Sequence, residues 1–107
     1  MNPEVKEKWV AALRSGKYKQ VEGRLRSDTG DSYCCLGVLC DVNNPRQWKS
    51  DDGYYVYLYK STVGNDLLPL ALKGELEIDE IVEEFLSNWN DDGIGFDAIA
   101  DWIEAEL

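Results

Sequence analysis

The sequence contains no histidine. This absence excludes Ser-His-Asp and Cys-His catalysis, histidine metal ligands and the usual general base near neutral pH. No Walker loop and no dinucleotide-binding glycine pattern occurs either. An enzyme would have to use carboxylates, cysteine, lysine or tyrosine, and no motif groups such residues. We therefore expect a protein that is not an enzyme and that has no catalytic residues and no cofactor.

Positive charge is missing from the last third of the chain, because no lysine or arginine follows Lys73. That third carries twelve acidic residues, whereas the first 26 residues hold seven bases and three acids, within a formal net charge of −10. Such uneven charge concerns solubility and the choice of partners rather than the fold. Because each phosphate contact needs a cation, the acidic third argues against direct nucleic-acid binding.

Long apolar runs are also absent. No segment approaches the roughly 20 residues of a membrane span, and the first residues lack the apolar stretch of a signal peptide. Three cysteines, an odd number, fit poorly with a disulfide framework. We therefore expect a cytoplasmic protein with reduced thiols and no membrane contact. Its length of 107 residues fits a single globular domain, residues 1–107, with one core.

Hydrophobic spacing and turn residues predict an α+β domain in which a helix, a strand, a helix, a β-hairpin and two helices follow one another. The first helix is predicted over residues 3–15, where Asn2 can cap its start and Gly16 can end it. The alternating residues 17–26 predict a strand beside it.

The most apolar run, residues 33–42, is predicted to form a buried central helix that Asp31 or Ser32 can cap. Gly37 lies on the side away from the main apolar face of this helix. A residue without a side chain at that place allows another backbone to approach closely.

A tyrosine-rich β-hairpin is predicted over residues 47–60, with its turn at residues 51–53. Alternation places Tyr55, Tyr57 and Tyr59 on one side of the second strand. Two uses of this stripe fit the pattern equally. The rings pack as an ordinary sheet face, or they stack a ligand or hold a protein.

The acidic end of the chain is predicted to fold into two amphipathic helices, over residues 78–89 and 96–107. A loop over residues 61–66 and a single helical turn over residues 67–72 precede them. In this prediction the apolar residues, Ile81 included, face inward and most acids face outward, so that the two helices form an acidic hairpin. The candidate partner-binding residues on its outer face are Glu80, Glu83, Glu84, Asp97, Asp101 and Glu104.

The three cysteines, Cys34, Cys35 and Cys40, all lie in the central apolar run. Burial in the core is the ordinary place for Cys35 and Cys40. No histidine or second cysteine pair completes a zinc site, so no metal is expected. Because the first turn of a helix stabilises a thiolate, a reactive Cys34 is the alternative to a buried one.

Three segments support a family resemblance: residues 9–20, residues 33–41 with their Tyr-Cys-Cys-Leu-Gly-Val-Leu-Cys block, and residues 90–104. With them the chain resembles a family of small, functionally uncharacterised proteins encoded by tailed bacteriophages and prophages. The resemblance implies no catalytic residues. It implies an accessory protein made in a bacterial host cytoplasm, where such proteins often inhibit or redirect host machinery, including antiviral defence.

Two binding functions follow as hypotheses. In the first, the acidic hairpin binds a basic surface of a host protein and inhibits or redirects that protein, and charge makes the association salt-sensitive. In the second, a homo-oligomer sequesters an anionic small molecule such as a nucleotide signal, with pockets at the subunit interfaces. The residues assigned to that ligand are Arg24, Arg26, Tyr55, Tyr57 and Tyr59. A third interpretation gives the acidic surface no role beyond solubility.

Overall fold

The computed structural model describes residues 1–107, apart from the side chain of Asp51. Its architecture is α+β, as the sequence predicts. The elements are α1 (Pro3–Arg14), β1 (Lys19–Gln20), β2 (Ser32–Tyr33), α2 (Cys35–Asn43), the 3-10 helix η1 (Pro45–Gln47), β3 (Trp48–Asp51), β4 (Tyr54–Tyr59), β5 (Thr62–Gly64), α3 (Leu70–Glu75), α4 (Glu80–Asp91) and α5 (Phe96–Glu106).

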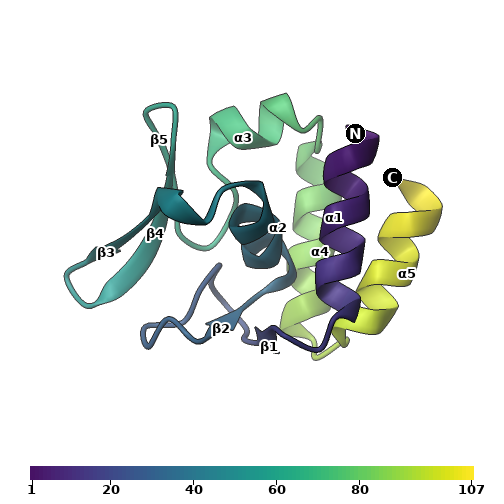
Figure 1. The fold of residues 1–107 in the computed structure, drawn as a ribbon, viewed down its shortest axis with the longest axis horizontal. Helices are drawn as coiled ribbons and strands as arrows, with labels where there is room; N and C mark the ends of the chain where they lie inside the picture. Colours follow the sequence, from purple (N-terminus) through teal and green to yellow (C-terminus); the bar gives the residue numbers. More distant parts are fainter.

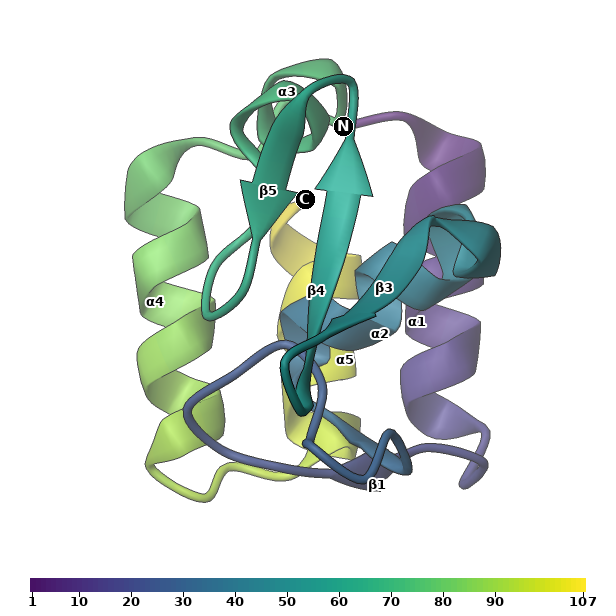
Figure 2. The ribbon, with the colours of Figure 1, turned by 90° about the vertical axis from the view of Figure 1, so that its left-hand side faces the viewer.

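Three layers make up the fold (Figure 1). The helices α1, α4 and α5 form one outer layer, the strands β3, β4 and β5 form the other, and α2 lies between them. Figure 2 shows the sheet in front of α2, with α3 at one end of the molecule. The sheet is antiparallel in the order β3-β4-β5, and Trp48 pairs with Tyr57 in its register. β1 and β2 form a separate parallel pair.

The central helix α2 is buried on every side from Cys35 to Cys40, and its last three residues are half-buried. A helix that is apolar all round belongs in the core. Its N-cap is Cys34, whose sulfur accepts a hydrogen bond from the Gly37 N–H at 3.4 Å. The predicted caps Asp31 and Ser32 are wrong, because the chain is still in β2 at Ser32 and the Asp31 carboxylate accepts bonds from its neighbours in the preceding turn.

Gly37 has no side chain at the point where another backbone crosses α2. A Cβ atom on Gly37 would lie 1.8 Å from the carbonyl oxygen of Leu25. That carbonyl also accepts a hydrogen bond from the Cys34 N–H at 3.1 Å, so it cannot move away without losing the bond. The close approach that the sequence predicts at Gly37 is therefore confirmed.

Two of the predicted elements differ from the structure. Residues 17–26 contain only the two-residue strand β1, because Gly23, at a φ of 81°, turns the chain away. Residues 61–66, predicted as a loop, contain β5. The turn before β5 places Lys60 and Ser61 at φ values of 44° and 66°. Such turns usually carry Asn-Gly or Asp-Gly, so this one had no recognisable sequence signal.

The other predicted elements are present: α1, α2, the β3–β4 hairpin, α4 and α5. The single helical turn predicted over residues 67–72 overlaps α3 only in part, because α3 begins after Pro69 and continues to Glu75. None of the described helices is long and apolar enough to span a membrane.

We predict that Gly37→Ala lowers the free energy of unfolding by about 3 kcal/mol or more, because a methyl group cannot fit against the Leu25 backbone. Gly74→Ala is the matched control. Gly74 lies in α3, and a Cβ atom there would have no neighbouring atom within 4 Å. This variant should be neutral or stabilising by up to about 1 kcal/mol. Urea unfolding followed by tryptophan fluorescence measures both, and equal stability of the two variants would contradict the prediction.

Candidate functional site

The six predicted acidic residues do not form one continuous surface. Glu80, Glu84 and Asp97 are exposed, as expected. Asp101 and Glu104 are also exposed, but both bond to Arg14, with nitrogen–oxygen distances of 2.7 and 3.0 Å.

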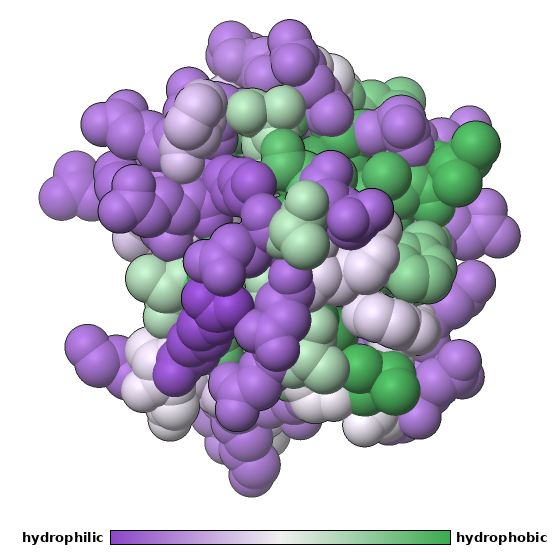
Figure 3. All heavy atoms as spheres, turned by 90° about the vertical axis from the view of Figure 1, so that its right-hand side faces the viewer, coloured by the Kyte–Doolittle hydropathy of each residue, from purple (hydrophilic) through white to green (hydrophobic). Residues whose placement is uncertain are grey.

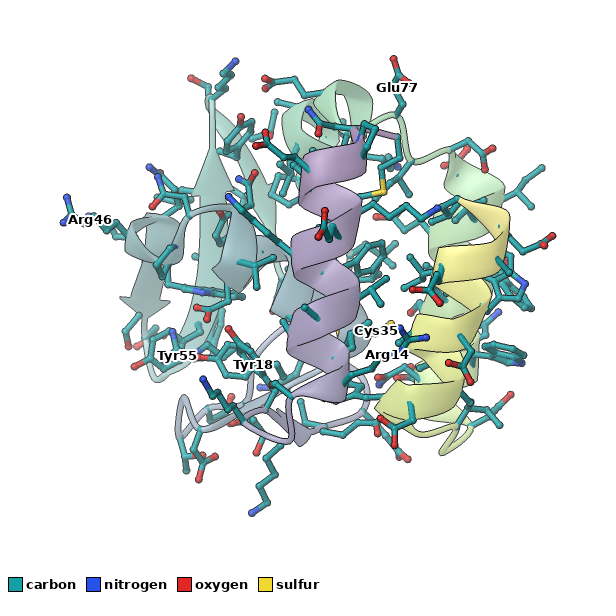
Figure 4. All side chains as sticks on the ribbon, turned by 45° about the vertical axis from the view of Figure 1, so that its right-hand side comes forward. Arg14, Tyr18, Cys35, Arg46, Tyr55 and Glu77 are labelled. Carbon is teal, nitrogen blue, oxygen red and sulfur yellow. The ribbon has the colours of Figure 1, made fainter. Side chains whose placement is uncertain are left out.

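Figure 4 shows Arg14 projecting from α1 toward α5, whereas Arg46 and Glu77 extend away from the body of the protein. The hydrogen bonds from Arg14 lower the pKa of Glu104. The ion pair therefore joins α1 to α5 and neutralises part of the predicted acidic face.

Glu83 is the predicted surface acid that the structure places in the core, with 2% of its surface exposed. Its Oε2 accepts a hydrogen bond from the Leu68 N–H at 2.8 Å, and its Oε1 lies 3.1 Å from the Lys73 ammonium. Helical spacing assigned Glu83 to the outer face of α4. That assignment is wrong because the carboxylate satisfies a backbone donor and a cation from the segment before α4.

Asn90 is the second polar residue on the buried face of α4, and it is fully buried. Its Oδ1 accepts hydrogen bonds from the Cys35 N–H at 3.0 Å and from Gln20 Nε2 at 2.9 Å. Its Nδ2 donates to the Val21 carbonyl at 2.8 Å. Asn90 thus ties α4 to the start of α2 and to the segment around β1.

These two polar residues lie on the inward side of α4. The fully buried residues of α4 are Glu83, Leu86 and Asn90, and Val82, Phe85 and Trp89 pack against the core as well. Ile81, which the sequence placed on the apolar inner face, is instead 80% exposed. This orientation of α4 therefore leaves the apolar side chain of Ile81 on the outside of the helix.

A groove of about 590 Å³ lies between α4 and residues 67–73. Leu67, Leu70 and Ile81 line it and are exposed by 44%, 70% and 80%. Glu80 and Glu84 line it as well and are exposed. The groove therefore combines exposed apolar side chains with exposed acidic ones.

The five residues assigned to an anionic ligand are not brought together as one site. Arg24 forms an ion pair with Asp28. Tyr57 is fully buried, and its hydroxyl donates to the Asn44 carbonyl at 3.0 Å. Tyr59 is half-buried and packs against the core. Two of the three tyrosines in the predicted stripe, Tyr57 and Tyr59, therefore pack inside the protein.

Arg26 and Tyr55 are the two ligand candidates that do meet. The Arg26 guanidinium lies 4.0 Å from the centre of the Tyr55 ring, 5.1 Å from that of Tyr33 and 5.3 Å from that of Trp48. Its Nε donates to the Gly30 carbonyl at 2.9 Å. These contacts are cation–π interactions within the chain, and they hold the loop before β2 against the hairpin.

All three cysteines are free and buried. Burial raises the pKa of the Cys34 thiol to about 12, and it raises the pKa values of Cys35 and Cys40 well above normal. The structure therefore places Cys34 in the core rather than at the surface, and loss of water opposes the thiolate more than the helix N-terminus favours it. Among the residues that the structure describes, no cluster of acids and cysteines is arranged to hold a metal ion.

We predict that no cysteine of the folded protein reacts with Ellman's reagent at pH 8 within minutes, because each thiol is buried and protonated. All three should react once the protein is unfolded in guanidinium chloride. The colour change at 412 nm counts the reacted thiols, and one fast-reacting thiol in the native protein would contradict the burial of Cys34.

We predict that Glu83→Gln lowers the free energy of unfolding by about 1–3 kcal/mol, because the Lys73 ammonium loses its carboxylate in a largely buried place. Glu84→Gln, one residue further along α4 and exposed, should change it by less than about 0.5 kcal/mol. Urea unfolding compares the two, and similar losses would show that Glu83 has no special structural role.

Comparison with known proteins adds a family match. The family model described as "Domain of unknown function (DUF8296)" matches residues 1–107. No curated protein and no solved structure matches the chain.

Proposed function

Since the chain belongs to the DUF8296 family, a domain of unknown function, we propose its function from its surface: it binds a partner protein through the outer side of α4 and the start of α5. The observation that supports this proposal is the exposure of Glu80, Glu84 and Asp97. No base follows Lys73 in the chain, and Lys73 is itself paired with Glu83.

The charge of this surface selects the class of partner. A negative surface without bases attracts a basic protein surface, and it repels nucleic acid and anionic lipid. Arg14 does not cancel it, because its guanidinium is engaged with Asp101 and Glu104. Association should therefore be fast at low salt and weaker as the salt concentration rises.

The resemblance of residues 9–20, 33–41 and 90–104 to phage proteins supports a bacterial setting for this binding. In that setting the protein acts in the host cytoplasm. It inhibits or redirects a host protein that has a basic surface, including one of antiviral defence. The proposal involves no reaction and no cofactor.

The experiment compares two triple variants that each lose three negative charges. The face variant is Glu80→Gln/Glu84→Gln/Asp97→Asn, and its control is Glu7→Gln/Glu22→Gln/Asp52→Asn, which neutralises exposed acids on other elements. Tagged wild-type protein is used to capture a partner from bacterial lysate at low salt, the partner is identified by mass spectrometry, and its Kd is measured for each variant.

The face variant should weaken binding about tenfold, at roughly 0.5 kcal/mol for each charge lost, and the control should weaken it less than about threefold. Equal weakening by both variants would mean that only the net charge matters. That result, or the absence of any captured partner at low salt, would overturn the proposal and leave the acidic surface a role in solubility.

A further inference from the structure

Exposed apolar side chains gather at one place on the surface. Among the described residues, five large hydrophobic side chains are exposed: Leu67, Leu70 and Ile81, which line the groove beside α4, and Tyr54 and Val63, which do not. In Figure 3, hydrophobic side chains gather on the α4 side of the helical face, and hydrophilic ones cover most of the α1 side. Contiguous exposed apolar surface of this kind marks interaction sites.

The dimensions of the groove suit a short helix. Its α4 wall runs from Glu80 to Asn88, which is about 12 Å at 1.5 Å per residue. This length corresponds to about two turns of a helix lying alongside. Helices that bind in grooves insert apolar side chains spaced by three, four and seven residues.

The two walls of the groove are held in place before any partner arrives. The buried Glu83 carboxylate receives the Leu68 N–H and the Lys73 ammonium, so it joins α4 to the opposite wall. An arrangement that is already formed does not lose further conformational freedom on binding. The groove is therefore a fixed feature of the fold, and Glu83 is a positioning residue for it.

The charges of the groove indicate the chemistry of its occupant. Glu80 and Glu84 are exposed at the groove, whereas the single base that lines it, Lys73, is neutralised by Glu83. A binding partner that complements the groove would present a row of apolar side chains flanked by lysine or arginine. A second copy of this chain is disfavoured, because each copy carries a net charge of −10 and would bring the same acids to the contact.

We infer that this groove binds an amphipathic, basic helix of the partner protein. Leu67, Leu70 and Ile81 contact the apolar row of that helix, and Glu80 and Glu84 pair with its flanking cations. The inference rests on the proposed function. It deepens that function by stating what the partner offers: a helix with one apolar face and a basic rim, not merely a basic surface.

The first test uses three synthetic 14-residue peptides and fluorescence anisotropy. One peptide carries leucines at helical spacing with lysines elsewhere, the second has the same composition in scrambled order, and the third has glutamate in place of lysine. The first should bind the full chain with a Kd in the range of about 1–100 μM, and the other two at least about tenfold more weakly. Equal binding of the scrambled peptide, or no binding of the first, would overturn the inference.

The second test locates the binding on the protein. Leu70→Ser and Ile81→Ser should each weaken binding of the first peptide about five- to tenfold, as each removes a contact worth about 1–1.4 kcal/mol. Val63→Ser is the matched control, because Val63 is 59% exposed on β5 and outside the groove. All three positions are exposed, so urea unfolding should confirm that each variant folds. A similar loss with Val63→Ser would overturn the inference, and so would a concentration-dependent dimer that Ile81→Ser dissociates.

The same variants separate this inference from the broader proposal when they are tested on the captured partner. If the face variant weakens capture while Leu70→Ser and Ile81→Ser do not, the acidic surface binds the partner and the groove does not. If all of them weaken capture, both stand. If none does, both fail.

Discussion

The burial of α2 from Cys35 to Cys40 is the constraint on which the other elements depend. A buried helix start needs protein partners for its free N–H groups. The Cys34 sulfur accepts from the Gly37 N–H, and Asn90 of α4 accepts from the Cys35 N–H. The Trp9 indole of α1 also donates to the Cys35 carbonyl, at 2.9 Å. Gly37 lets the backbone at Leu25 cross the helix. These contacts place α1, α4 and the loop after β1 around a common centre.

The orientation of α4 follows from the same constraint. Asn90 must face inward to reach α2, and Glu83, seven residues earlier on the same side of the helix, faces inward with it. Two inward positions that an amphipathic helix would give to apolar residues are therefore polar. Apolar Ile81 lies outside instead, next to the groove. Local departures of this kind from the usual pattern are expected where a surface has a function.

The charge asymmetry of the chain has two different outcomes in the fold. On the α1–α5 side, Arg14 meets Asp101 and Glu104, so the basic start and the acidic end of the chain neutralise each other locally. On the α4 side, Glu80 and Glu84 remain exposed beside apolar side chains. The proposed binding uses this second region, where charge can select a partner and apolar contact can hold it.

Apolar spacing and turn residues by themselves determined the α+β class, the main helices and the hairpin. These features depend on residues near one another in the chain, and so they can be predicted. Only the tertiary structure decided that Glu83 is buried, that Ile81 is exposed, that Cys34 is buried and that Arg26 lies among three rings. Each of these outcomes depends on contacts with distant segments of the chain. Spacing along one helix or strand carries no information about which distant group will need a partner.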